Sequence, residues 1–459
     1  MDTFVARKRT PHPLPPGPPG YPLVGMLPSM RRNPLQCLTD AARRYGDMVY
    51  LRLGRRPAYF LNHPDHIAHV LQTHHRNYRK SELVEPLKPF LGTGLATSDG
   101  DLWRRQRRLI QPAFHRPHMA TFTTIVTETT ATLLDRWRPL ASRSAPVDLL
   151  PEMMRLTGTI IVNALFGTTL CDPEATLLDD FRVVTAYSLR RLLAWTAWSA
   201  HVPTAKRRRY RQALRRLEAT VWHIIGTRRR SGASGDDLLA RLLVAHDPET
   251  GGRMSDRQLR DEVMTLFFAG HETTGLALTW TWYLLASYPA VAAQVRGELA
   301  TVLQGRAPTV QDLPYLRYTR MVIQEALRLY SPAWILSRAP IADDVIGGYP
   351  IPAGMTVLLS PYVTHRHPRW WAQPDQFDPE RFAPERVTDR PRFAYFPFSG
   401  GPRQCIGEPL AWLEAQCIVA MIAQRYRLAL LPGHQVTPSA VLTLRPRGGL
   451  PVTLQALPR

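Results

Sequence analysis

The spacing of apolar residues along the chain predicts a mainly α-helical protein with small β-sheets. Between residues 101 and 330, apolar side chains recur three and four positions apart and glycines are few, which is the period of a helix that packs along one face. The longest helix is expected over residues 255–288. Its positions after Met264 are nearly all apolar, so we expect this helix to be buried on every side.

Short strands are expected near both ends of the chain. Residues 45–61 alternate between apolar and polar positions, which predicts two strands joined at Gly54 and then a helix that begins at Pro64. In the last third of the chain prolines and glycines recur. There we expect a strand at 356–360 and a hairpin-like pair of strands over 442–454.

The predicted domain organisation is simple. Residues 1–30 are a proline-rich lead-in, whose run Pro15–Gly20 is stiff and extended because proline fixes φ and lacks an amide hydrogen. Residues 31–459 are expected to form one domain.

The composition is that of an ordinary globular protein. Hydrophobic residues make up 44% of the chain and charged residues 21%, which is ample material for a core. The 42 prolines and 28 glycines are too few for a collagen-like or disordered chain. The 4 cysteines include no C-x-x-C pair, so the sequence argues against a disulfide scaffold, a zinc ribbon and a dithiol redox site.

The formal net charge is +21, most of it from arginine. Such a charge favours an acidic partner, which can be nucleic acid, anionic lipid or an acidic protein. A signal peptide is not expected, because the proline-rich residues 11–22 stand where it would need a run of about 7–15 apolar residues. A spanning helix is not expected either, because no apolar run of about 18–20 residues is free of charges. We therefore expect a cytoplasmic protein without a transmembrane anchor, and a peripheral membrane contact stays open.

A cysteine in a glycine-rich loop is the first candidate for chemistry. Residues 398–407 read F-S-G-G-P-R-Q-C-I-G, and a helical pattern begins at Glu408. Glycines let the backbone approach a bulky group, and nearby N–H groups stabilise a thiolate, the form of cysteine that binds a metal. Taken alone, such a loop is also compatible with a buried structural cysteine.

This string resembles the heme-binding signature of the cytochrome P450 family, F-x-x-G-x-R-x-C-x-G. All five specified positions match, namely Phe398, Gly401, Arg403, Cys405 and Gly407. The resemblance covers residues 15–459 and implies the family's fold, a mainly helical triangular prism with small β-sheets, with residues 31–459 as the heme domain. It also implies heme b as the cofactor and Cys405 as the axial ligand of the heme iron.

A second motif resembles the E-x-x-R of the same family. Glu325 and Arg328 are one helical turn apart and can pair, and Arg381 lies in a downstream P-E-R-F segment. The resemblance implies that these three residues form a buried structural network and take no catalytic step.

The long helix carries A-G-H-E-T-T at 269–274, which resembles the family's oxygen-activation motif. We expect Gly270 to leave room for the cofactor and the Thr273 hydroxyl to bond a carbonyl four residues earlier. The resemblance implies that Glu272 and Thr273 are catalytic, with Glu272 supplying a proton route from solvent. A zincin site is excluded, because H-E-x-x-H would need a histidine where Gly275 stands.

Trp103 and Arg107 match the family's W-x-x-x-R. They share one helix face, so the indole and the guanidinium can reach one heme propionate. The resemblance adds Arg338 and Arg403 as further propionate contacts. The neighbouring basic residues are expected to form a solvated face, with a partner-docking role left open: Arg104, Arg105 and Arg108.

Together these resemblances imply a heme-thiolate monooxygenase, which inserts one oxygen atom of O2 into a hydrophobic substrate by hydroxylation or epoxidation. A terpenoid, carotenoid or fatty acid is expected, because the residues at the family's substrate wall are apolar, and a weak similarity to carotenoid-hydroxylating bacterial members points the same way. The expected wall consists of Phe90, Leu91, Leu266, Phe268, Ala269, Ala333, Trp334, Ile335 and Leu336. Electrons are expected from a ferredoxin or flavodoxin with its reductase, and the +21 charge suits an acidic donor.

Three alternatives stay open. A peroxide-using or isomerising relative needs no proton relay, so the pair Glu272 and Thr273 argues against it. A non-catalytic heme-binding protein is disfavoured for the same reason. A nucleic-acid-binding protein would explain the charge but neither the glycine-bearing helix nor the Cys405 loop, so no nucleic-acid partner is expected.

Overall fold

The computed structural model describes residues 14–54, 56–167, 174–193, 204–232 and 235–457, so the first 13 residues of the lead-in lie outside the described part. The described residues pack as two compact units. Unit 1 comprises the chain up to Glu82 with Ile335–Pro374 and Pro391–Gln404, and unit 2 comprises Leu83–Trp334, Asp375–Arg390 and the chain from Cys405 onward.

Unit 1 is built around a five-stranded sheet with the strand order β1-β2-β8-β5-β3. Strands β2 and β8 are parallel, and the other neighbours are antiparallel. A two-stranded antiparallel ribbon, β6-β7, accompanies the sheet. The helices and strands are α1 (Leu27–Arg32), α2 (Pro34–Tyr45), β1 (Met48–Leu53), β2 (Arg56–Leu61), α3 (Pro64–Ala68), β3 (Tyr78–Arg79), β5 (Leu336–Pro340), β6 (Asp344–Ile346), β7 (Tyr349–Ile351), β8 (Thr356–Leu359) and α14 (Pro361–Thr364).

Both strands expected in the first 61 residues, and the helix after them, are confirmed in unit 1. In the register of β1 with β2, Met48 lies opposite Leu61, and the turn between the strands contains Gly54 at φ +63°. Helix α3 begins at Pro64, as predicted, because proline suits the first turn of a helix. The core of this unit is a cluster of apolar side chains from the sheet and the segments around it, including Tyr59, Leu61, Ile67, Leu71, Val357, Leu359, Phe393 and Phe396.

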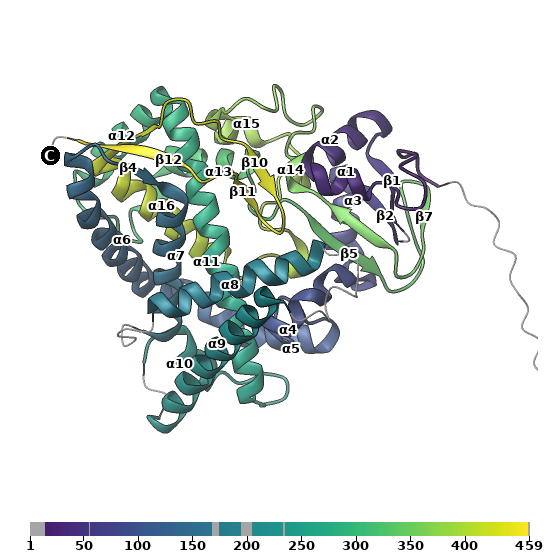
Figure 1. Ribbon diagram of the computed structural model, residues 1–459, viewed down its shortest axis with the longest axis horizontal. Coiled ribbons are helices and arrows are strands. Elements are labelled where there is room, and N and C mark those ends of the chain that lie inside the picture. The colour runs from purple at the N-terminus through teal and green to yellow at the C-terminus, as the bar shows by residue number, and fades with distance from the viewer. Residues whose placement is uncertain (1–13, 55, 168–173, 194–203, 233–234, 458–459) are drawn as a thin grey trace, which may run out of the picture. The chain divides into compact units, whose positions relative to one another are not determined.

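Unit 2 is mainly helical (Figure 1). Its helices are α4 (Lys88–Leu91), α5 (Gly100–Ile110), α6 (Met119–Ser142), α7 (Leu149–Phe166), α8 (Glu174–Leu193), α9 (Ala205–Arg230), α10 (Leu238–Val244), α11 (Asp256–Ser287), α12 (Pro289–Leu303), α13 (Arg317–Leu329), α15 (Pro384–Val387) and α16 (Glu408–Arg425). Its strands are β4 (Pro146–Asp148), β9 (Tyr426–Leu430), β10 (Pro438–Ala440), β11 (Leu444–Pro446) and β12 (Pro451–Ala456).

Helix α11 confirms the long helix expected from the sequence. Ser255 caps its N-terminus, where the Ser255 hydroxyl accepts a hydrogen bond from the Gln258 amide at 3.2 Å. The helix packs against α7, α9, α13 and α16 of the same unit, which explains why it is apolar almost all round. Burial is interrupted near its middle, where Ala269 is exposed and Gly270 and Thr273 are half-buried.

The C-terminal strands differ from the prediction. Residues 442–454 do contain two strands, β11 and β12, with Gly448 and Gly449 between them at φ +79° and +85°. The strands do not pair with each other, however. Strand β11 pairs with β10, and β12 joins β4 and β9 in a separate three-stranded sheet. The glycine pair does lie in a turn, but the hairpin partner of β11 is β10 on its other side, and the connecting residues 441–443 contain no glycine.

One helix among the described residues, α7, is long and apolar enough to cross a membrane. Of that stretch, 61% is buried inside the protein. Core helices of folded domains have the same length and composition, so this helix is weak evidence for a membrane span.

Candidate functional site

Cys405 lies directly before helix α16, whose N-cap is Gly407. The backbone N–H groups of Gly407 and Glu408 face the sulfur and lower the pKa of the thiol, as does the Arg107 guanidinium. Cys405 is exposed, yet protein crowds around the sulfur, and this desolvation raises its pKa more strongly. The N-terminus of an α-helix is electropositive, so the position suits a thiolate that is stabilised further by a bound cation.

Arg107 is the predicted propionate residue that the structure brings near Cys405. It lies half-buried on α5, one turn after Trp103 on the same helix, and its Nε donates to Gln111 Oε1 at 3.1 Å. Burial lowers the pKa of the Arg107 guanidinium, and the charge of the Cys405 sulfur opposes that shift. A guanidinium that is partly removed from water is stabilised by an anionic partner, so Arg107 suits a contact with a carboxylate.

Four other predicted cofactor residues lie in unit 1. Phe398 and Arg403 are half-buried, and Arg338 is buried on β5, where its Nη1 donates to the Ser337 carbonyl at 2.8 Å. Gly401 has φ +67°, and a Cβ there would come within 1.8 Å of the Leu71 carbonyl oxygen. Close packing inside unit 1 is therefore sufficient reason for glycine at position 401.

Two threonine hydroxyls bond backbone carbonyls in the middle of α11, around the predicted oxygen motif. Thr273 Oγ1 donates to the Ala269 carbonyl at 2.5 Å, the bond to a carbonyl four residues earlier that the sequence predicts. Thr157 of α7 donates to the His271 carbonyl at 2.8 Å. A Cβ at Gly270 would lie 2.9 Å from Ile161 Cδ1, so this glycine also lets α7 approach α11.

Glu272 is buried and held by two residues from the β10-β11 hairpin. Its Oε1 accepts hydrogen bonds from Thr443 Oγ1 and Arg445 Nη2, and the second contact is an ion pair. Among the described residues, no protein partner is recorded for Glu272 Oε2. No sequence motif indicates this clamp, because about 170 residues separate the acid from its partners.

Glu325, Arg328 and Arg381 come together in the interior of unit 2. Arg328 donates to Glu325 through Nε at 2.6 Å and Nη2 at 2.8 Å, and Arg381 Nε lies 3.3 Å from Glu325 Oε1. The Asp378 amide also donates to Glu325 Oε1, at 3.0 Å. Burial raises the pKa of the Glu325 carboxyl, and Arg328 opposes that shift. This network ties α13 to the segment that contains the P-E-R-F sequence.

The predicted substrate wall is only partly assembled within unit 2. The ring of Phe90 on α4 contacts Phe181 of α8 and Phe268 of α11, with centroid distances of 5.1 and 5.8 Å. Leu91 and Leu266 are buried, whereas Ala269 is exposed and Ala333 half-buried. Trp334 is buried, and its indole N–H donates to the Val441 carbonyl at 3.2 Å. Ile335 and Leu336 belong to unit 1 and are half-buried there.

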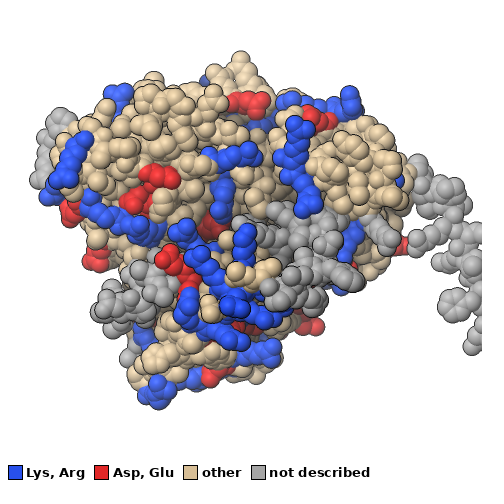
Figure 2. Space-filling model, viewed as in Figure 1, with Lys and Arg blue, Asp and Glu red and all other residues tan. Residues whose placement is uncertain are grey.

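Three of the four arginines of α5 have acidic partners. Arg105 and Arg108 both pair with buried Asp247, and Arg104 pairs with Asp101. A different basic surface lies on α9, in the lower middle of Figure 2. Among the described residues, no ion pair is recorded for five exposed members of this helix: Lys206, Arg208, Arg209, Arg211 and Arg215.

Comparison with known proteins identifies the family. The family model described as Cytochrome P450 matches residues 15–450. Cyclooctatin synthase of Streptomyces melanosporofaciens is 39% identical over 436 residues, which cover 94% of this chain and 93% of that protein. Cyclooctat-9-en-7-ol 5-monooxygenase of the same organism is 38% identical over 419 residues, which cover 91% and 90%.

The fold agrees with that assignment. The crystal structure of the cytochrome P450DA heme domain superposes with a TM-score of 0.89 at 28% sequence identity, covering 97% of this chain and 98% of that one. The mainly helical fold with small sheets that the sequence predicts is thereby confirmed as the family's fold. The chain belongs to the cytochrome P450 family, and it is a monooxygenase that uses heme iron, O2 and a redox partner to oxygenate a hydrophobic substrate.

Proposed function

We propose that this monooxygenase hydroxylates or epoxidises a terpenoid, with heme b bound at Cys405. The names of the two relatives support the substrate class, since one is a monooxygenase of cyclooctat-9-en-7-ol and the other a cyclooctatin synthase. The wall residues Phe90, Leu91 and Phe268 support a bulky apolar ligand as opposed to a charged one. Carotenoids and fatty acids share that chemistry, and the experiment below separates the three.

The donor set around Cys405 fits a heme. The sulfur faces two backbone N–H groups and the Arg107 guanidinium. Together these groups favour a thiolate that binds iron, with a carboxylate of the same cofactor, a heme propionate, beside it. A Cβ at Gly407 would meet no atom within 4 Å, so protein packing does not explain this glycine. When bound, heme would supply the activation of O2 and the oxygen transfer, and Cys405 would hold its iron. Trp103, Arg107, Arg338 and Arg403 would hold its propionates.

The proton-handling role falls to Glu272 and Thr273. Oε1 of Glu272 is occupied by the donors Thr443 and Arg445, so the proton would be taken up and released at Oε2. The Thr273 hydroxyl hydrogen is engaged by the Ala269 carbonyl, which leaves the hydroxyl oxygen free to accept a hydrogen bond from a neighbouring group. Glu272 and Thr273 are consecutive in α11 and point in different directions, so the anchored carboxylate and the hydroxyl would serve as two separate stations of a relay.

A separate ferredoxin or flavodoxin with its reductase would supply electrons. The net charge of +21 supports an acidic donor, because opposite charges accelerate diffusional encounter. Reduction by an acidic ferredoxin should therefore slow as sodium chloride is raised, since salt screens the attraction. A reduction rate independent of salt would exclude steering by charge.

The absorption spectrum of the dithionite-reduced protein, with and without carbon monoxide, tests the site. The observation that carries the proposal is the Cys405 sulfur at the start of α16 beside Arg107. We expect the red-shifted Soret band of a thiolate-ligated ferrous heme, its loss in Cys405→Ser, and its retention in the matched control Cys37→Ala. Absence of a heme band from protein produced with heme available would refute the cofactor and the function together.

Spectral titration of the ferric protein tests the substrate class. Cyclooctat-9-en-7-ol, β-carotene and palmitic acid should be compared at equal protein concentration, and the reconstituted reaction should be analysed for products with one added oxygen. We expect a saturable spectral shift and an oxygenated product with the terpenoid. A shift with only palmitic acid or only β-carotene would refute the terpenoid proposal and leave the monooxygenase activity standing.

A further inference from the structure

The segment of residues 92–98 connects two elements of the proposed site. It follows α4, which carries Phe90 and Leu91 of the proposed substrate wall, and it precedes α5, which carries Trp103 and Arg107. The position of this segment therefore fixes both the wall and the helix that is proposed to contact the heme. The contacts that hold this segment in place are therefore expected to influence ligand binding.

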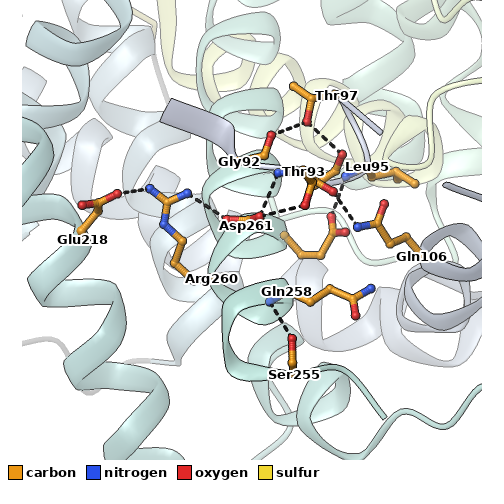
Figure 3. A network of polar contacts seen from close by, with 12 residues as sticks. Gly92, Thr93, Leu95, Thr97, Gln106, Glu218, Ser255, Gln258, Arg260 and Asp261 are labelled. Carbon is orange, nitrogen blue, oxygen red and sulfur yellow. Dashed lines mark hydrogen bonds and ion pairs between the residues drawn. The ribbon is translucent and has the colours of Figure 1, made fainter. Parts of the chain in front are cut away.

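Two adjacent carboxylates of α11 hold the backbone of this segment. The Thr93 amide donates to Asp261 Oδ2 at 2.8 Å, and the Thr93 hydroxyl donates to the same oxygen at 3.2 Å (Figure 3). The Leu95 amide donates to Glu262 Oε2 at 2.9 Å. These amides lie outside regular secondary structure, so the carboxylates supply the partners that a helix or sheet would otherwise provide.

Two glycines show how closely the segment lies against α11. A Cβ at Gly92, where φ is +61°, would come within 2.1 Å of Asp261 Oδ1. A Cβ at Gly94 would come within 2.3 Å of Thr265 Oγ1 and 2.6 Å of the Asp261 carbonyl oxygen. A side chain at Gly92 would displace the Asp261 carboxylate, and one at Gly94 would also clash with the backbone of α11.

The carboxylates are buried, and the contact extends to the neighbouring helices. Asp261 is 4% exposed and Glu262 is fully buried. Arg260 Nη1 donates to Asp261 Oδ1 at 2.9 Å, and the same guanidinium pairs with Glu218 of α9. On the other side, Gln106 of α5 donates to the Thr93 carbonyl at 2.7 Å. Burying several charged groups is costly, and an apolar contact would hold a loop at lower cost if its exact position did not matter.

We propose that Asp261 and Glu262 are positioning residues that set which bulky ligands the substrate wall accepts. They act through the backbone of residues 93–95, which places Phe90 against Phe181 and Phe268. The effect on ligands rests on the proposed function, since it takes Phe90 as part of the wall. The attachment of the segment to α11 is independent of that function.

Glu262 offers a graded test in the heme-loaded protein. Glu262→Met removes the acceptor at nearly constant volume, whereas Glu262→Gln keeps an oxygen that can accept from the Leu95 amide. Hydrogen exchange of the Leu95 amide should accelerate about tenfold or more in Glu262→Met, because the lost bond is to a charged group, and much less in Glu262→Gln. Asp256→Asn, an exposed acid in the first turn of the same helix, serves as the matched control.

Two azole ligands separate positioning from general stability. Imidazole is small and reports the heme iron alone, whereas clotrimazole carries a bulky apolar group that must also fit the wall. Glu262→Met should weaken clotrimazole binding about tenfold while imidazole affinity stays within about twofold, and Glu262→Gln should restore most of the clotrimazole affinity. Gly94→Ala, which displaces the segment from the loop side, should reproduce the effect of Glu262→Met in a protein whose carboxylates are intact.

Each outcome decides the proposal. Unchanged exchange at Leu95 would show that Glu262 does not hold the segment and would overturn the inference. Faster exchange with equal losses for both azoles, or with no loss, would overturn the positioning role. A protein that binds no heme would refute the proposed function instead, and the exchange of Leu95 would still decide whether α11 holds this segment.

Discussion

The clamp on Glu272 permits a quantitative prediction about the pair Glu272 and Arg445. Two unit charges about 4 Å apart attract by about 4 kcal/mol at an effective dielectric constant of about 20. Water reaches the pair, because the Arg445 side chain is 37% exposed, and this screening reduces the net value. The Glu272 side chain is only 11% exposed, so a larger share of the attraction is kept than at a surface pair. We expect a coupling free energy of about 1–2 kcal/mol.

A double-mutant cycle with Glu272→Gln and Arg445→Gln measures that coupling. Arg445→Gln should lower the free energy of unfolding by about 2 kcal/mol, because it leaves a buried carboxylate without its cation. The double variant should be more stable than the sum of the single losses predicts, by the coupling free energy. Urea unfolding of the heme-loaded protein, followed by far-ultraviolet circular dichroism, gives all four values. Losses that add within about 0.3–0.5 kcal/mol would refute the clamp.

The interior network and the acid stability of unit 2 give two further predictions. Arg328→Leu should lower the free energy of unfolding by about 3–5 kcal/mol in urea, because Glu325 is left charged and buried. Adding Glu325→Gln to this variant should recover part of the loss. Losses from the two substitutions that simply add would contradict the network. The bidentate Arg306 guanidinium holds the pKa of Asp312 well below its ordinary value of 3.8, so this stabilisation is fully present above pH 3.8 and is lost as the pH falls below it. Asp312→Asn should therefore lower stability near pH 7 and flatten the decline in acid, and an acid limb parallel to that of the unmodified protein would contradict the assignment.

Local sequence signals predicted the elements of the fold well where the physical cause is local. Pro64 at a helix start and Gly54 in a turn act within a few residues, and the structure has a helix or turn at each. The pairing of β11 with β10 was missed although it is local, because the connecting residues 441–443 contain no glycine or proline and the glycine pair at 448–449 pointed to a different turn. The division into two units was also not apparent from the sequence, since unit 1 joins the first part of the chain to two segments that follow much later.

The residues of the candidate site likewise fall into those that a sequence motif identifies and those that only their spatial neighbours identify. Motif spacing brought Glu325, Arg328 and Arg381 to attention, and the structure joins them by ion pairs. By contrast, Arg445 and the carboxylates Asp261 and Glu262 carried no motif. Their importance comes from what lies opposite them in space, a buried acid for Arg445 and two loop amides for the carboxylates. A solvated basic face was predicted for Arg104, Arg105 and Arg108, because their acidic partners were not apparent from the sequence.

Helix α11 sets a constant distance between the carboxylates that hold residues 92–98 and the residues proposed to transfer protons. Glu262 and Glu272 lie on one uninterrupted helix, about 15 Å apart along its axis. A single inserted or deleted residue between them would rotate everything beyond it by about 100°, and no rotamer change could compensate. Evolution of new substrate preferences is therefore expected to change the length of residues 92–98 and of the β10-β11 hairpin, while the number of residues between Glu262 and Glu272 stays constant.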